Sequence, residues 1–225
     1  MLPAIRVRPD WRGYCFWGST GRRAVRAVVF VDYQNVYHGA RDAFFSPSDR
    51  SSFGAVHPLA LGRLLASRGL ADTHLHQVRV YRGVPHPARD PRAHRAATRQ
   101  VAAHQAEDPA LVKHVLRPLQ YPTAWPRERA REKGVDVALA VDFVAMALEG
   151  AFDVGVIVST DTDLRPALEA ITQRGRAPKC EVAAWQRADK RSPRLSIGVS
   201  PLWCHWLSRS DYEAVADRTN YARAS

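Results

Sequence analysis

The chain has 225 residues, of which 46% are hydrophobic, enough for one sizeable domain with its own core and too many for a wholly disordered chain. Lysine and arginine number 33 against 22 aspartates and glutamates, so the surplus of positive charge favours a polyanionic partner such as nucleic acid. No run approaches the roughly 18 apolar residues of a membrane-spanning helix, and the N-terminus lacks an apolar signal core. We therefore expect a cytoplasmic protein without a membrane partner.

Strands and helices are expected to alternate along the chain. The apolar run at 27–32 ends in an aspartate and is typical of a buried parallel strand. Further strands are expected at 73–83, 111–119, 152–159 and 179–185, with a short one at 202–207. Helices are expected at 57–70, 90–106, 135–150, 164–175 and 210–221. Asp90 and Pro91 supply an N-cap and a first-turn proline, and the segment 135–150 is apolar on most faces and should be largely buried.

This alternation predicts an α/β fold, in which a mostly parallel sheet of about five strands lies between layers of helices. Ligands of such sheets gather beyond the carboxyl ends of the strands, and the start of each following helix faces the same edge. The acids expected there are Asp32, Asp136, Asp161 and Asp163. Carboxylates packed together repel one another unless a cation lies between them, and Mg²⁺ or Mn²⁺ prefers such oxygen ligands. A divalent metal site is the hypothesis that follows.

Each acid taken alone has a simpler explanation. Asp163 suits the N-cap of the following helix, Asp136 suits the positive end of its own helix, and Asp32 could be a turn residue. Asp142 lies six residues after Asp136, roughly 240° around the helix, so the two cannot point the same way. We expect Asp142 either to contact and orient the metal-binding acids without binding the metal itself, or to form its hydrogen bonds with a neighbouring helix or strand. Single explanations leave the clustering of the acids unexplained.

Three segments together resemble the motif blocks of a known family. They are "VVFVDYQNVYHGA", "KGVDVALAVDFVAMA" and "VGVIVSTDTDLRPALEAITQRG". In this order and spacing they resemble NYN domains, specifically the LabA-like branch of the PIN-like nuclease superfamily. The resemblance covers roughly residues 26–187. It divides the chain into an irregular extension over 1–24, a nuclease domain over 25–187 and an extension over 188–225 that packs on the domain.

The resemblance implies a PIN-like Rossmannoid three-layer sandwich and a metal-dependent ribonuclease site that uses Mg²⁺ or Mn²⁺. By motif, the catalytic positions are the first-block pair Asp32 and Asn35, the second-block acid Asp136, and the third-block pair Asp161 and Asp163. The four aspartates would hold the metal ion, and Ser159 and Thr160 would line the same edge for the substrate. RNA is the implied partner.

Two basic segments are candidates for binding the RNA. The loop at 120–134 leads directly into the second motif block and carries Trp125, Arg127, Arg129, Arg131 and Lys133. Its arginines and lysine can contact phosphates, and its tryptophan can stack on an unpaired base. Arg89, Arg92, Arg95 and Arg99 form a second stripe at helical spacing. A run of charges is commonly only a solvated face, and the loop is the stronger candidate because of its position.

Alternative functions remain. A phosphatase of the haloacid dehalogenase type is disfavoured, because its D-x-D nucleophile motif would normally follow the first strand, where this chain has Asp32-Tyr33-Gln34. A dinucleotide-binding enzyme is disfavoured because it needs a G-x-G-x-x-G turn that the chain lacks. Neither three scattered cysteines nor the histidine spacing indicates zinc. The serious alternative is an RNA-binding regulator on the same fold that cleaves little or nothing, whose site would be expected to lack an acid. The oligomeric state stays open, with a homodimer among the alternatives.

Overall fold

A six-stranded parallel sheet organises the chain, which the computed structural model describes over residues 23–50, 52–69, 72–174, 178–189, 192–198 and 200–223. The strand order is β3-β2-β1-β4-β5-β6, and every neighbouring pair is parallel. The strands are β1 (Val25–Asp32), β2 (Thr73–Val84), β3 (Val112–Pro118), β4 (Val154–Val158), β5 (Lys179–Trp185) and β6 (Trp203–Leu207). The expected irregular extension lies outside the described residues except for its last two.

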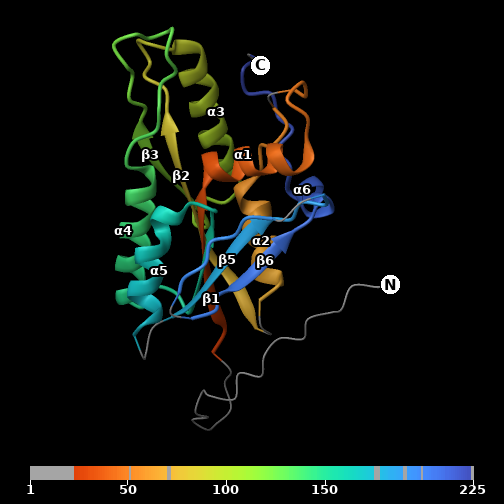
Figure 1. Ribbon diagram of the computed structural model, residues 1–225, viewed down its shortest axis with the longest axis vertical. Coiled ribbons are helices and arrows are strands. Elements are labelled where there is room, and N and C mark those ends of the chain that lie inside the picture. Colours follow the sequence, from red (N-terminus) through yellow and green to blue (C-terminus); the bar gives the residue numbers. More distant parts are fainter. Residues whose placement is uncertain are drawn as a thin grey trace.

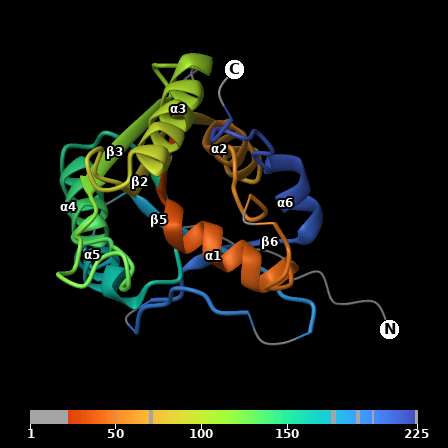
Figure 2. The same ribbon diagram turned by 90° about the horizontal axis from the view of Figure 1, so that it is seen from above.

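Helices cover both faces of the sheet (Figures 1 and 2). One face carries α4 (Val135–Leu148) and α5 (Arg165–Thr172), the latter preceded by a short 3₁₀ turn η1 (Thr162–Leu164). The other face carries α1 (Tyr33–Phe44), α2 (Pro58–Ser67), α3 (Pro91–Glu107) and α6 (Arg209–Val215). The α/β prediction with a central parallel sheet is confirmed. None of the described helices is long and apolar enough to span a membrane.

The apolar run of β1 follows from its central position. Val28 and Phe30 belong to the core cluster beneath α4 and α5, whereas Val29 and Val31 belong to the cluster beneath α1 and α2. Because both faces of a parallel sheet are covered, its central strands read as continuous apolar runs rather than as alternating ones. Helix α1 follows β1 without a loop and is not among the elements expected from the sequence.

Two helix predictions differ in outcome. Asp90 caps α3 as expected, since its Oδ1 accepts a hydrogen bond of 3.0 Å from the N–H of Ala93. Helix α4 is not largely buried, and that prediction is wrong for one of its faces. Val137, Val141 and Leu148 are 59%, 60% and 55% exposed, because α4 packs on the sheet with one face only.

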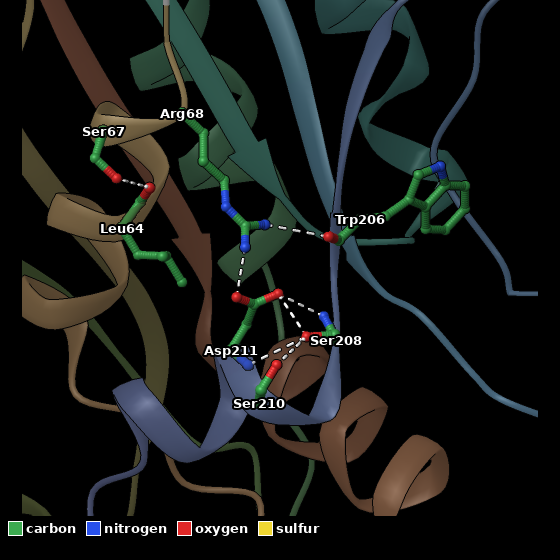
Figure 3. A network of polar contacts seen from close by, with 7 residues as sticks. All are labelled: Leu64, Ser67, Arg68, Trp206, Ser208, Ser210 and Asp211. Atoms are coloured by element: carbon green, nitrogen blue, oxygen red, sulfur yellow. Dashed lines mark hydrogen bonds and ion pairs between the residues drawn. The ribbon is translucent and has the colours of Figure 1, made fainter. Parts of the chain in front are cut away.

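The C-terminal segment completes the sheet. Figure 3 shows how β6 and α6 are joined to α2: Arg68, which ends α2, donates to the Trp206 carbonyl at 3.2 Å and to the Asp211 carboxylate. Ser208 and Asp211 form a capping box at the start of α6. The helix expected at 210–221 ends at Val215, because the chain then turns extended at Ala216 and pairs with Val56.

Candidate active site

A cleft of about 680 Å³ opens at the carboxyl edge of the sheet, where the chain order reverses between β1 and β4. The segments that follow these neighbouring strands diverge there, which is the usual place for a ligand in an open α/β sheet. Five acids line the cleft, namely Asp32, Asp42, Glu132, Asp136 and Asp161. Among its described lining residues the single lysine or arginine is Arg187, which pairs with Asp42. The cleft is therefore strongly acidic in a chain with an overall positive charge.

Asp32 lies at the centre of this cluster. It is the last residue of β1 and the N-cap of α1, and its Oδ1 accepts a hydrogen bond of 3.2 Å from the N–H of Asn35. The side chain is only 7% exposed. Burial raises the pKa of its carboxyl to about 6, and the negative charges of Glu132 and Asp161 act in the same direction. The hydrogen bonds from the Asn35 N–H and the Ser159 hydroxyl oppose this shift.

Polar side chains tie the end of β4 to the end of β1. The Ser159 hydroxyl donates to Asp32 Oδ2 at 3.0 Å and accepts from the N–H of Asp161 at 3.1 Å. Asn35 Oδ1 accepts from both the N–H and the hydroxyl of Thr160, at 3.0 and 3.2 Å. The first and third motif blocks thus form one hydrogen-bonded unit, and its five residues had all been selected from the sequence.

Asp161 also shapes the chain that follows. Its Oδ1 accepts a hydrogen bond of 3.0 Å from the N–H of Asp163 and caps the 3₁₀ turn η1. The capping role considered for Asp163 therefore belongs to Asp161. Asp163 itself is exposed and is not among the residues that line the cleft.

The third wall of the cleft comes from the start of α4. Gly134 adopts a left-handed conformation, with φ of 71°, that turns the chain into the helix and brings Asp136 to the cleft in its first turn. Three of the four acids proposed as metal ligands, Asp32, Asp136 and Asp161, thus line one cleft.

Glu132 and Asp42 are the acids of the cleft that sequence reasoning missed, and Glu132 lies beside the start of α4. Its Oε1 accepts a hydrogen bond of 2.5 Å from the N–H of Gly83, and a Cβ at position 83 would lie 2.8 Å from Glu132 Cγ, so glycine permits the contact. Burial raises the pKa of Glu132, and the charge of Asp136 adds to this, against the Gly83 hydrogen bond and the charge of Arg82. Its position two residues before Gly134 was the available signal, but the loop had been considered only for its basic residues.

The remaining selected residues lie outside this cleft. Asp142 binds Arg79 Nη2 at 2.6 Å and the Tyr81 hydroxyl at 2.8 Å, so a neighbouring strand satisfies it. Trp125 packs edge-on against Tyr121, with ring centroids 4.8 Å apart. The side chains of Arg127, Arg129, Arg131 and Lys133 are exposed and do not line the cleft.

The acids fit a hydrated divalent cation better than a fully chelated one. No three His, Cys, Asp or Glu side chains of the described residues are grouped closely enough to hold a metal ion by themselves. The acidic groups that line the cleft nevertheless supply carboxylate oxygens as donors. Burial disfavours the charged form of Asp32, and a bound cation would stabilise that form. Mg²⁺ keeps several waters and is usually bound by one or two carboxylates together with substrate phosphates. The donor set meets that requirement.

Comparison with known proteins gives one family match. The family model for the NYN domain matches residues 26–192. None of the curated proteins compared with the chain matches it. Among solved structures, a protein of unknown function from Vibrio parahaemolyticus is similar at 19% identity and a TM-score of 0.47, over 73% of this chain and 84% of that one. A likeness at this level carries no argument about function.

Proposed function

Because the chain belongs to the NYN domain family of the PIN-like nuclease superfamily, we propose that it is a metal-dependent ribonuclease that hydrolyses phosphodiester bonds in single-stranded RNA. The observation that carries this proposal is the convergence of Asp32, Asp136 and Asp161, from three separate motif blocks, on one acidic cleft. Acidity is unusual for the binding site of a polyanion, and a bound cation between the carboxylates and the phosphate would resolve the conflict. The same three blocks support membership of the LabA-like branch.

The proposed metal ion is Mg²⁺ or Mn²⁺, held by Asp32 and Asp161 with Asp136 as a further ligand. When bound, such an ion lowers the pKa of a coordinated water and offsets the charge that builds on the phosphoryl oxygens. Glu132 lies on the same wall as Asp136 and joins the candidates. Asp163, which the motif comparison also suggests as a ligand, is the weakest of the set because it is exposed outside the cleft.

The other residues of the cleft orient these acids. The Ser159 hydroxyl fixes one oxygen of Asp32, and the Asn35 N–H fixes the other. The amide oxygen of Asn35 accepts a hydrogen bond from the Thr160 N–H, and this bond fixes the position of the loop after β4 relative to α1. Since Asn35 is neutral, it provides this support without adding to the repulsion between carboxylates. Ser159 and Thr160 also line the cleft and are proposed to contact the substrate.

Phosphates further along the strand are proposed to contact the loop at 120–134. Arg127, Arg129 and Arg131 are exposed there, with Lys133 next to Gly134 at the start of α4. The ring of Trp125, half-buried against Tyr121, is available for stacking only on its free surface. Of the second basic stripe, Arg89 lies before α3 and over the Tyr121 ring, and Arg99 on α3 donates to the backbone carbonyls of residues 221 and 223, so these two arginines also serve the fold.

A specific observation favours the second candidate, an RNA-binding regulator with little or no cleavage. The described residues contain no preformed group of three metal-binding side chains. A direct test incubates the protein with labelled single-stranded RNA in Mg²⁺, Mn²⁺ or EDTA. Cleavage with either ion and none in EDTA is expected. RNA binding without cleavage in any of the three would replace the ribonuclease with the regulator.

A further inference from the structure

A second groove lies beside the acidic cleft and shares lining residues with it. It has a volume of about 470 Å³, within the roughly 300–1,000 Å³ of small-molecule sites. We call it the side groove; its walls include Tyr33, Tyr37, Arg82, Ala96, Leu119 and Tyr221. Gln34, His38 and Glu132 line both the side groove and the cleft. The two sites are therefore separated by only one row of side chains.

Helix α1 is the ridge between the two sites, and its periodicity distributes its residues between them. Tyr33 and Tyr37, one turn apart, line the side groove. Asn35, Gly39 and Asp42 line the cleft, on the opposite flank. Gln34 and His38 lie between these rows and are exposed. A chain molecule crossing the ridge at Gln34 and His38 would place one unit in each site.

The floor of the side groove is held rigidly by polar contacts. The guanidinium of Arg82 lies over the Tyr33 ring, 4.7 Å from its centroid, and donates to Gln100 Oε1 at 2.7 Å. The Gln100 amide in turn donates to the Tyr33 hydroxyl at 2.8 Å and to Asp217 Oδ2 at 3.3 Å. Asp217 also binds His104 Nε2 at 2.9 Å. A site whose side chains are already fixed loses little entropy on binding a ligand.

The lining suits a flat, uncharged heterocycle better than a phosphate. The groove is lined by two acids, Glu132 and Asp217, and by one guanidinium, that of Arg82, so a phosphate would meet more negative than positive charge. The aromatic side chains of Tyr37 and Tyr221 and the aliphatic side chains of Ala96 and Leu119 offer surfaces for a π face. The amide of Asn220 and the carboxylates among the lining residues offer both donors and acceptors to the edges of a base.

We propose that the side groove binds one unpaired nucleobase of an RNA strand whose adjacent phosphate lies in the acidic cleft. The inference rests on the proposed ribonuclease function and extends it, because it assigns a binding position to the nucleotide beside the cleaved bond. Helix α3 makes room for the base: Ala93, Ala96 and Ala97 line the groove, and larger side chains at these positions would fill it.

The test fills the groove without changing its charge. Ala96→Leu keeps a good helix former on α3 and projects into the groove, and Ala102→Leu, at an exposed position of the same helix outside the groove, is the matched control. Ala93→Leu is a second filling variant, for use if circular dichroism shows Ala96→Leu to be unfolded. The substrate is a short single-stranded RNA in which one base at a time is removed, leaving the backbone intact. Dissociation constants are measured in Mg²⁺ with every protein of the comparison carrying Asp161→Asn, which is expected to bind RNA without cleaving it.

For the wild type and Ala102→Leu, removing the base at one position next to the mapped cleavage site should weaken binding about five- to 150-fold, the range expected for a lost stacked base. Ala96→Leu should bind the intact RNA more weakly and show no further loss when that base is removed. An equal loss in all three proteins, or none in the wild type, would overturn the side-groove proposal while leaving cleavage as evidence for the ribonuclease. If the wild type binds RNA but cleaves none, the same comparison at every position still tests the groove, and only the ribonuclease proposal falls.

Discussion

The Ser159 hydroxyl lies 3.0 Å from Asp32 Oδ2 and 3.1 Å from the backbone nitrogen of Asp161. One buried side chain thus joins the ends of two neighbouring strands, β1 and β4, and fixes both acids that face the cleft from them. The arrangement holds negative charges close together, and no lysine or arginine among the described residues lowers the pKa of Asp32. The charge of the buried Asp32 therefore destabilises the native state, and the first prediction concerns that destabilisation.

Asp32→Asn should stabilise the metal-free fold at neutral pH. The pKa of Asp32 is raised from its ordinary value of 3.8 to about 6, so ionising it opposes folding increasingly as the pH rises through that range. The penalty is absent below about pH 4 and complete above about pH 6, where it amounts to about 3 kcal/mol. Asparagine keeps the N-cap oxygen and carries no charge. Urea unfolding should therefore show a gain at pH 7.5 that disappears at pH 4.

The control for this prediction is Asp163→Asn, a change at an exposed position outside the cleft. Its stability should match that of the wild type at both pH values. If Asp32→Asn were no more stable than the wild type at pH 7.5, or equally stabilised at pH 4, the buried carboxylate would not carry the cost assigned to it.

Ser159→Ala should move the pH dependence of cleavage. The hydrogen bond from Ser159 lowers the pKa of Asp32, so its loss raises that pKa above about 6 and leaves less of the charged form near neutrality. The acid limb of the pH–rate profile should shift to higher pH. In contrast, Thr160→Ala removes a hydroxyl that contacts Asn35 rather than Asp32 and should leave that limb in place. Identical shifts in both variants would point to a general disturbance of the β4 loop.

Asp161→Asn should abolish cleavage while the protein stays folded and binds RNA at least as well as the wild type. The amide can still accept the hydrogen bond from the Asp163 N–H, so the turn after β4 keeps its cap. The lost charge removes a proposed metal ligand and reduces repulsion of phosphate. Mn²⁺ should raise the melting temperature of the wild type more than that of the variant. A variant that cleaves at the wild-type rate would remove Asp161 from the site.

The comparison for Asp161→Asn is the same substitution at its exposed neighbour Asp163. Asp163→Asn should retain most of the cleavage activity, because the Asp163 side chain lies outside the cleft. An equally large loss in this variant would mean that Asp163 reaches the metal ion when RNA is bound, as the motif comparison implies.

Much of the fold was predictable because the central strands are apolar on both faces. The run at 27–32 and the segment at 179–185 correspond closely to β1 and β5, and β6 was expected as a short strand at 202–207. Helix α1 was missed because Asp32 both ends the strand and caps the helix, so no loop marks the boundary. The exposed face of α4 was missed because valines and leucines point outward there as well as inward. Residue types alone do not tell which face meets the sheet.

The candidate site was predictable to the extent that it follows from topology. Strand ends and helix starts share an edge, and this rule brought Asp32, Asp136 and Asp161 to one cleft. Glu132 could not be found in this way, since it lies in a loop and reaches the cleft through a contact with the backbone of Gly83 on β2. The position of a loop side chain depends on the conformation of the whole loop, and the local periodicity of the sequence does not specify that conformation.

Replacing Arg127, Arg129 and Arg131 together with alanine should weaken RNA binding and flatten its salt dependence, since each lost phosphate contact removes about 0.7 from the slope on a single strand. The backbone of Arg131 pairs with Gln120 through two hydrogen bonds of 2.9 Å, so alanine should preserve the loop while removing its charge. At saturating RNA the cleavage rate should largely survive, because these side chains are proposed to hold ground state and transition state alike. Arg92→Ala with Arg95→Ala, exposed on α3, is the comparison. An unchanged slope in the loop variant with a reduced slope in the α3 variant would transfer the RNA-binding surface to α3, whereas loss of the saturated rate would assign the loop to the chemical step.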